Sequence, residues 1–142
     1  MKLLTKLKIK DIPDDLYAKL YRLNFRSDGE MQRNLKSARD GYGKAYAYVL
    51  LDDNETVVSW ALVNFPGSSE REVNFYTRAN KRRKGYGTVL AEAIKKDYGR
   101  KLLHFPHDKA SDNFYVAIDL HGEYCESLLG GAARMRFDDD DE

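Results

Sequence analysis

Alternating and helical runs of hydrophobic positions divide the chain into strands and helices. A β-like alternation predicts a first strand over Leu3 to Ile9. Three later runs have the apolar, β-branched and aromatic content of strands. These runs are Ala45–Asp53, Thr56–Phe65 and Arg71–Thr77. Because only short turns separate them, they predict an antiparallel meander.

Helical spacing surrounds this meander. The segment Asp11-Ile-Pro-Asp-Asp offers a polar cap, a proline for the first turn and acidic residues near the positive end of a helix. Tyr17 and Tyr21 form a second stripe, one turn apart, on the helix that this segment starts. The apolar positions of three predicted helices are Leu16, Leu20 and Leu23; Met31, Leu35 and Ala38; and Val89, Leu90, Ala93 and Ile94.

The last third of the chain continues the same architecture. Lys101 to Phe105 predicts a buried strand, and Ser111 to Ile118 fits a helix, with a strand as the alternative. A hairpin centred on Gly130-Gly131 then leads into a final strand over Arg134–Phe137. We therefore expect a single domain over residues 1–137, followed by an acidic, solvated and disordered tail over residues 138–142.

Composition and charge narrow the class of protein. The chain has 142 residues, of which 42% are hydrophobic and 33% charged, as in soluble globular domains. A formal net charge of +1 argues against a globally basic nucleic-acid binder. Cys125 is the only cysteine, so no internal disulfide can form. No apolar run is long enough for a membrane span or a signal peptide, and we expect a cytoplasmic protein without a membrane partner.

One octet, KRRKGYGT from Lys81 to Thr88, combines four consecutive cations with two glycines where a helix starts. The first turn of a helix has amide groups without intrahelical partners, and the helix dipole adds partial positive charge there. Gly85 and Gly87 leave room for a phosphate to approach the backbone, and the cations can neutralise its charge. The octet therefore predicts a phosphate-binding turn, with a solvated basic turn as the plain alternative.

The spacing Arg82-x-x-Gly85-x-Gly87, placed between an apolar strand and an amphipathic helix, resembles the GCN5-related N-acetyltransferase (GNAT) family. The specific stretch is Phe75 to Ile94, and the order of the predicted elements matches over most of Leu3 to Phe137. The resemblance implies an α/β fold of the α+β layered kind. Its central mixed, mostly antiparallel sheet would have six or seven strands, flanked by about four helices.

The resemblance implies that acetyl-coenzyme A (acetyl-CoA) is the cosubstrate and that no metal takes part. The pyrophosphate would bind the loop Arg82, Arg83, Lys84, Gly85, Tyr86, Gly87 and Thr88. The end of the preceding strand, Phe75, Tyr76 and Thr77, would bond the pantetheine arm through its backbone. The activity implied is acyl transfer, in which an amine attacks the thioester directly without an acyl-enzyme.

Catalytic candidates follow from the same resemblance. Tyr115, in Ser111-Asp-Asn-Phe-Tyr, matches the tyrosine that protonates the departing thiolate, with Tyr124 in reserve; a core tyrosine is the alternative. Glu72 is the candidate general base, with Glu70 beside it, because an amine arrives protonated and must lose a proton. The competing interpretation is that both are exposed carboxylates at the strand edge.

The acceptor would be an amine borne by a protein, an aminoacyl group or a small molecule. Its predicted groove has mixed aromatic and basic residues: Tyr17, Tyr21, Arg22, Phe25, Arg26 and the Gly130-Gly131 hairpin. The family also forms dimers, so a homodimer stays open. A second hypothesis is a catalytically degenerate binding module that holds nucleic-acid phosphates through its basic loop. Trp60 is predicted to lie in the core. His104 and His107, on either side of Pro106, suit proton relay, whereas His121 has no partner that the sequence identifies, and the histidines make no metal site.

Overall fold

The computed structural model describes residues 1–24, 29–65 and 71–99. The strands in this part are β1 (Lys2–Lys8), β2 (Lys44–Leu51), β3 (Val57–Phe65) and β4 (Glu72–Thr77). Its α-helices are α1 (Asp14–Arg22), α2 (Glu30–Arg39) and α3 (Tyr86–Tyr98). Two 3-10 turns, η1 (Ile9–Asp11) and η2 (Ala79–Lys81), precede α1 and α3.

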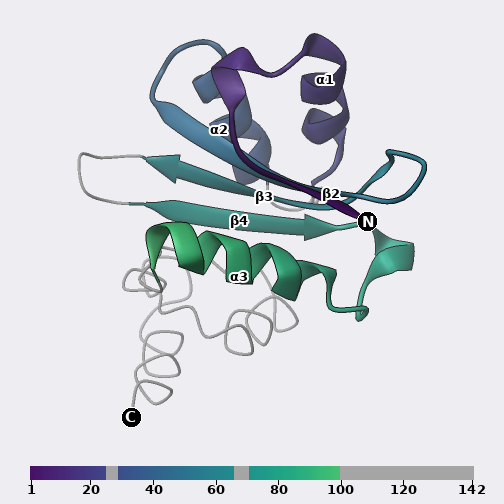
Figure 1. Cartoon of the computed structure of the whole chain (residues 1–142). Coiled ribbons are helices and arrows are strands. Elements are labelled where there is room, and N and C mark those ends of the chain that lie inside the picture. The colour runs from purple at the N-terminus through teal and green to yellow at the C-terminus, as the bar shows by residue number, and fades with distance from the viewer. Residues whose placement is uncertain (25–28, 66–70, 100–142) are drawn as a thin grey trace.

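The strands form one antiparallel sheet in the order β1-β2-β3-β4. Figure 1 shows α1 and α2 on one face of this sheet and α3 on the other. The described residues therefore form an α+β fold with a four-stranded meander between two helical layers. The strands and helix predicted beyond residue 99 lie outside the described residues.

The period of two along each strand distributes side chains between the two layers. In β2, Tyr48 and Leu50 join the hydrophobic cluster beneath α3, whereas Ala47 and Val49 join the cluster beneath α1 and α2. A register shift opposite Leu50 and Leu51 inserts an extra residue into β3, a β-bulge. Burial on both faces explains why β2 and β3 are apolar at nearly every position.

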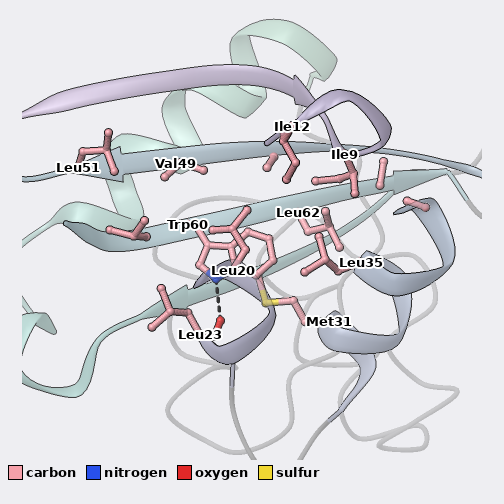
Figure 2. Close-up of a cluster of buried hydrophobic side chains, with 14 residues drawn as sticks. Ile9, Ile12, Leu20, Leu23, Met31, Leu35, Val49, Leu51, Trp60 and Leu62 are labelled. Atoms are coloured by element: carbon pink, nitrogen blue, oxygen red, sulfur yellow. Dashed lines mark hydrogen bonds between the residues drawn. The ribbon is translucent and has the colours of Figure 1, made fainter. Parts of the chain in front are cut away.

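The α1/α2 layer packs around the side chain of Trp60, whose exposed fraction is 0%. Figure 2 shows Trp60 among Leu20, Met31 and Leu62, with its indole nitrogen pointing to the end of α1. Its Nε1–H donates to the carbonyl of Leu23 at 2.6 Å. The prediction that Trp60 belongs to the core is confirmed.

Two sequence predictions about the helices need correction. We predicted a proline inside the first turn of α1, but Pro13 is the N-cap residue and Asp14 begins the helix, so Asp11 falls in η1. On α3, Val89 is exposed, and the buried residues are Leu90, Ala91 and Ile94. Val89 lies about 200° around the helix from Ala91, so a helix buried through Ala91 turns Val89 outward.

Candidate functional site

The glycine-rich turn is built by backbone conformation. Gly85 is the N-cap residue of α3 and has φ 83° and ψ 7°, in the left-handed region that favours glycine. Arg83, two residues earlier, also has a positive φ of 63°. A Cβ placed on Gly85 would meet no atom within 4 Å. The turn therefore needs glycine for its backbone angles, and the space beside it is open.

The start of α3 presents amide groups without intrahelical acceptors. The first bond across the turn is from the Val89 N–H to the Gly85 carbonyl at 3.1 Å. The three preceding amides, of Tyr86, Gly87 and Thr88, have no carbonyl four residues back within the helix. In the part of the chain that the structure describes, no side chain caps this end. These amides and the helix dipole favour an anion.

The cations of the octet have different placements. Arg83 and Lys84 are exposed beside the start of α3. Arg82 folds back, and its Nε–H donates to the carbonyl of Thr77 at 2.9 Å. Its guanidinium also lies 5.8 Å from the centre of the Tyr76 ring. Arg82 therefore ties the turn to the end of β4, whereas Arg83 and Lys84 add positive charge at the surface.

The predicted pantetheine segment precedes this turn, with Arg78 and η2 between them. Phe75, Tyr76 and Thr77 are half-buried at the end of β4. The Ser59 hydroxyl donates to the Tyr76 carbonyl at 3.1 Å and lies 2.7 Å from the Thr77 hydroxyl. These bonds fix the end of β4 against β3, so the strand, the turn and α3 form one continuous and well-anchored structure.

Glu72 is not the exposed carboxylate of the competing interpretation. Its side chain is buried, with an exposed fraction of 7%, and among the residues that the structure describes its Oε1 has no hydrogen-bond partner. Asn74 is 6% exposed, and its Oδ1 likewise has none. Sequence reasoning did not single out Asn74. The available signal was a second polar residue, two positions after Glu72, with apolar Val73 and Phe75 on either side of it.

The described part of the predicted acceptor groove lies on α1. Tyr17 and Tyr21 pack with ring centres 6.0 Å apart, which confirms their shared stripe. The Arg39 guanidinium from α2 lies 5.0 Å from the centre of the Tyr17 ring. Arg22 donates from Nε to the carbonyl of Ala18, one turn earlier on the helix. Glu72 and Asn74 share with Tyr76 the sheet face that α1 and α2 cover, so these candidates occupy one layer.

Several predicted residues lie outside the described residues, namely Phe25, Arg26, Glu70, His104, His107, Tyr115, His121, Tyr124, Cys125 and the Gly130-Gly131 hairpin. Within the described ranges, no three His, Cys, Asp or Glu side chains gather as metal ligands would. None of α1, α2 and α3 has both the length and the apolar character that crossing a bilayer requires.

Comparison with known proteins gives the fold and no family. The chain resembles the crystal structure of a mutant of the BH1408 protein from Bacillus halodurans, with a TM-score of 0.56 and 17% identity. This match covers 87% of the present chain and 94% of that chain. A tetramutant of the same protein gives a TM-score of 0.55 and 16% identity. No protein-family model and no curated protein matches the chain.

Proposed function

We propose that the protein is an N-acetyltransferase of the GNAT type, which moves an acetyl group from acetyl-CoA to a primary amine. The observation that carries this proposal is the N-terminus of α3, where a left-handed Gly85 closely follows β4 and no described side chain caps the helix. A negatively charged pyrophosphate fits the amides of Tyr86, Gly87 and Thr88. Under this proposal the sheet continues beyond β4 to the six or seven strands of that fold.

The positive charge of the turn supports the same ligand. Arg83 and Lys84 are exposed beside the helix start, so their side chains can approach phosphate oxygens from solvent. Arg82 has a different role, because its bond to the Thr77 carbonyl holds the turn against β4. The half-buried backbone of Phe75, Tyr76 and Thr77 then lies next to the phosphate site, where the pantetheine arm would extend.

The reaction uses Glu72 as the base. The bound ammonium gives one proton to the Glu72 carboxylate, directly or through water. The free amine attacks the thioester carbonyl carbon, so that a C–N bond forms and the C–S bond breaks. The nitrogen loses its second proton, and the leaving thiolate takes up one proton, for which Tyr115 is the candidate donor. The products are the acetylated amine, the free thiol of coenzyme A and one proton released to solvent.

Acetyl-CoA binding tests the phosphate turn. Isothermal titration calorimetry and thermal unfolding should show binding and a rise in Tm, because a ligand of the folded state stabilises it. Gly85→Glu places bulk and negative charge at the amides and should weaken binding at least about tenfold, equivalent to about 1.4 kcal/mol. The matched control is Gly41→Glu, because Gly41 also has a positive φ, of 91°, and open space for a Cβ.

Gly41 lies just after α2, in a different connection from the phosphate turn. The control variant therefore carries the same charge change and a similar backbone strain without touching the site. It should bind acetyl-CoA like the wild-type protein. Equal affinities of the Gly85→Glu variant and the wild-type protein would overturn the assignment of the turn, and no binding by the wild-type protein would overturn the function.

The second candidate function, a nucleic-acid-binding module, is favoured by the exposed Arg83 and Lys84 alone. Binding of that kind depends on release of counterions, so its affinity falls steeply with salt. Fluorescence anisotropy with a labelled DNA duplex at two salt concentrations distinguishes the two functions. Tight, salt-sensitive DNA binding together with no response to acetyl-CoA would favour the module.

A further inference from the structure

A second basic surface lies at the opposite end of α3 from the phosphate turn. Figure 1 shows the C-terminal end of α3 at the end of the sheet where β3 ends and β4 begins. Because α3 has 13 residues, this end lies about 18 Å from Gly85. Exposed cations and half-buried aromatic rings meet here, on the sheet face that α3 covers. In the part of the chain that the structure describes, the cations are Lys6, Lys8, Lys44 and Arg71, and the rings are Tyr46, Phe65 and Tyr98.

Strand register places two of these lysines beside the rings. Residues directly opposite each other in an antiparallel pair share one face of the sheet. Lys44 is opposite Phe65, which packs on the cluster beneath α3. Lys8 is opposite Tyr46, which lies two positions before Tyr48 of that cluster and so on the same face. Both lysines are exposed, so their charges are accessible to a ligand on this face.

Lys6 reaches the same surface through a β-bulge. The register of β1 on β2 shifts between Leu4 and Leu7, and Lys6 inside this bulge has a φ of 49°, in the left-handed region. A lysine in this conformation costs free energy, so the packing around it must hold it there. Its Nζ lies 4.0 Å from Oδ1 of Asp97 and 5.6 Å from the centre of the Tyr98 ring. The Lys6 side chain is still 53% exposed, so the bulge fixes an accessible cation beside an aromatic ring.

The aromatic rings form a continuous series between the cations. The ring centres of Tyr46 and Phe65 are 5.8 Å apart, and those of Phe65 and Tyr98 are 6.0 Å apart. The Arg71 guanidinium lies 5.6 Å from the centre of the Tyr98 ring. Because Lys6 and Arg71 both contact Tyr98, the half-buried Tyr46 at the other end of the series is better placed to contact a flat ligand.

Cations that alternate with aromatic rings fit a ligand that has both negative charge and flat groups. Single-stranded nucleic acid has both, because its phosphates repeat along the backbone and its unpaired bases can stack on aromatic side chains. In a duplex the bases stack on one another and are not available to a protein ring. An acidic peptide matches the charge of the surface, but it has no bases to stack on Tyr46.

We propose that this surface binds single-stranded nucleic acid, with a base stacked on Tyr46. The backbone phosphates contact the cations Lys6, Lys8, Lys44 and Arg71. This site is separate from acetyl transfer and needs no acetyl-CoA. It also differs from the nucleic-acid-binding module considered above, which would use Arg83 and Lys84 at the other end of α3.

Fluorescence anisotropy with the full chain and a labelled oligo(dT) of about 12 nucleotides tests the proposal. The comparisons are the same oligonucleotide in a duplex with its complement, and unlabelled poly-L-glutamate as a competitor. The single strand should bind at least about tenfold more tightly than the duplex, because only the single strand can stack on Tyr46. The logarithm of the affinity should fall linearly with the logarithm of the salt concentration, with a slope of about −0.7 for each phosphate contact.

Variants separate the charges from the ring. Lys44→Gln and Arg71→Gln should each make the salt slope shallower by about 0.7, because each removes one phosphate contact. Tyr46→Leu removes a ring and no charge, so it should weaken the affinity about tenfold and leave the slope unchanged. Lys19→Gln, at an exposed residue of α1 on the other side of the sheet, is the matched charge control and should change neither quantity.

Two-dimensional ¹H–¹⁵N NMR of the wild-type protein locates the ligand without any substitution. Oligo(dT) should shift the backbone amides of Lys8, Lys44 and Tyr46 more than those of Gly85 and Gly87 in the phosphate turn. These shifts, together with the shallower slopes of Lys44→Gln and Arg71→Gln, support the site. Larger shifts at Gly85 and Gly87 would assign binding to the phosphate turn and overturn the proposal.

Three other results would also overturn it. They are equal affinities for the duplex and the single strand, salt slopes that neither Lys44→Gln nor Arg71→Gln changes, and a wild-type protein that does not bind oligo(dT). Displacement of oligo(dT) by poly-L-glutamate at equal charge concentration would assign the surface to an acidic protein segment instead. Lys44→Gln and Arg71→Gln should bind acetyl-CoA like the wild-type protein. A chain that binds oligo(dT) here but not acetyl-CoA contradicts the proposed function alone.

Discussion

Trp60 shows at the scale of one residue how the central strand positions a helix. Its ring is fully buried, and its Nε1–H bonds the carbonyl of Leu23, the C-cap residue of α1. A carbonyl at a helix end has no intrahelical donor, so the indole satisfies a group that burial would otherwise leave without a partner. One side chain therefore both fills the α1/α2 layer and fixes where α1 ends.

Replacing Trp60 with phenylalanine tests this role. Trp60→Phe removes the bond to Leu23 and leaves a small cavity, so the free energy of unfolding should fall by about 2 kcal/mol. Urea unfolding followed by far-ultraviolet circular dichroism measures the loss. Tyr42→Phe is the control, because Tyr42 is 79% exposed and its substitution should change the stability by less than about 0.5 kcal/mol. Equal stabilities of the Trp60→Phe and wild-type proteins would contradict the role.

Residues differ in how far the sequence alone could place them. Trp60 was predictable, because a large aromatic residue in a continuous apolar strand has few other places to lie. Glu72 was harder, because a charged residue at a strand end is normally exposed. Only the three-dimensional structure shows that its carboxyl group is buried, with Asn74 beside it on the same face. The proposed role of Glu72 thus depends on the burial of its side chain, which the local sequence pattern does not determine.

At the scale of elements, periodicity predicted the order and kind of β1 to β4 and of the three described helices, with ends shifted by a few residues. The prediction of the buried face of α3 was partly wrong, because the helix has two overlapping apolar stripes. They are formed by Val89, Leu90, Ala91, Ala93 and Ile94. Periodicity cannot choose between such stripes, and the choice is made by packing on Tyr48, Val63 and Val73 of the sheet. The position of Gly85 before the helix was predictable, since its turn requires a left-handed residue.

The contact between α3 and β2 includes a buried phenol. The Tyr48 hydroxyl bonds the carboxylate of Asp97 on α3, and the Tyr98 ring packs edge-on with its centre 6.4 Å from that of Tyr48. Burial, followed by the bond to Asp97, raises the pKa of Tyr48 well above its ordinary value of 10.0. Burial also raises the pKa of Tyr98. Both phenols therefore stay protonated in the folded protein at a pH where the unfolded chain ionises.

This difference in pKa between the folded and unfolded states should make the protein less stable at alkaline pH. Below about pH 10 both states hold the phenol proton, so the contribution to stability is complete. Above it the unfolded state loses protons that the folded state keeps, and the free energy of unfolding falls, by about 1 kcal/mol per pH unit for one phenol. Urea unfolding from pH 7 to pH 11 should show this fall. Tyr48→Phe should make it shallower, whereas Tyr42→Phe, at an exposed phenol, should not.

At the scale of the whole molecule, β2 and β3 connect the two helical layers. Val58 and Val63 of β3 lie in the α3 cluster, whereas Trp60 and Leu62 lie in the α1/α2 cluster. Neither layer can lose its packing without exposing a strand that the other layer needs. The proposed phosphate turn and base use this arrangement, because the turn starts α3 while Glu72 faces α1 and α2 from the neighbouring strand, β4.

Shared strands should make unfolding a single transition, as in most domains of this size. Trp60 is the only tryptophan, so its fluorescence reports on the α1/α2 layer, and the ¹H–¹⁵N NMR signals of Leu90 and Ile94 report on the α3 layer. Both midpoints in urea should coincide. Acetyl-CoA at about 100 times its Kd should raise the free energy of unfolding by about 2.7 kcal/mol. Both urea midpoints should therefore rise equally, although acetyl-CoA would bind at α3. Separate midpoints, or a shift confined to the Leu90 and Ile94 signals, would mean that the layers unfold independently and that β3 does not couple them.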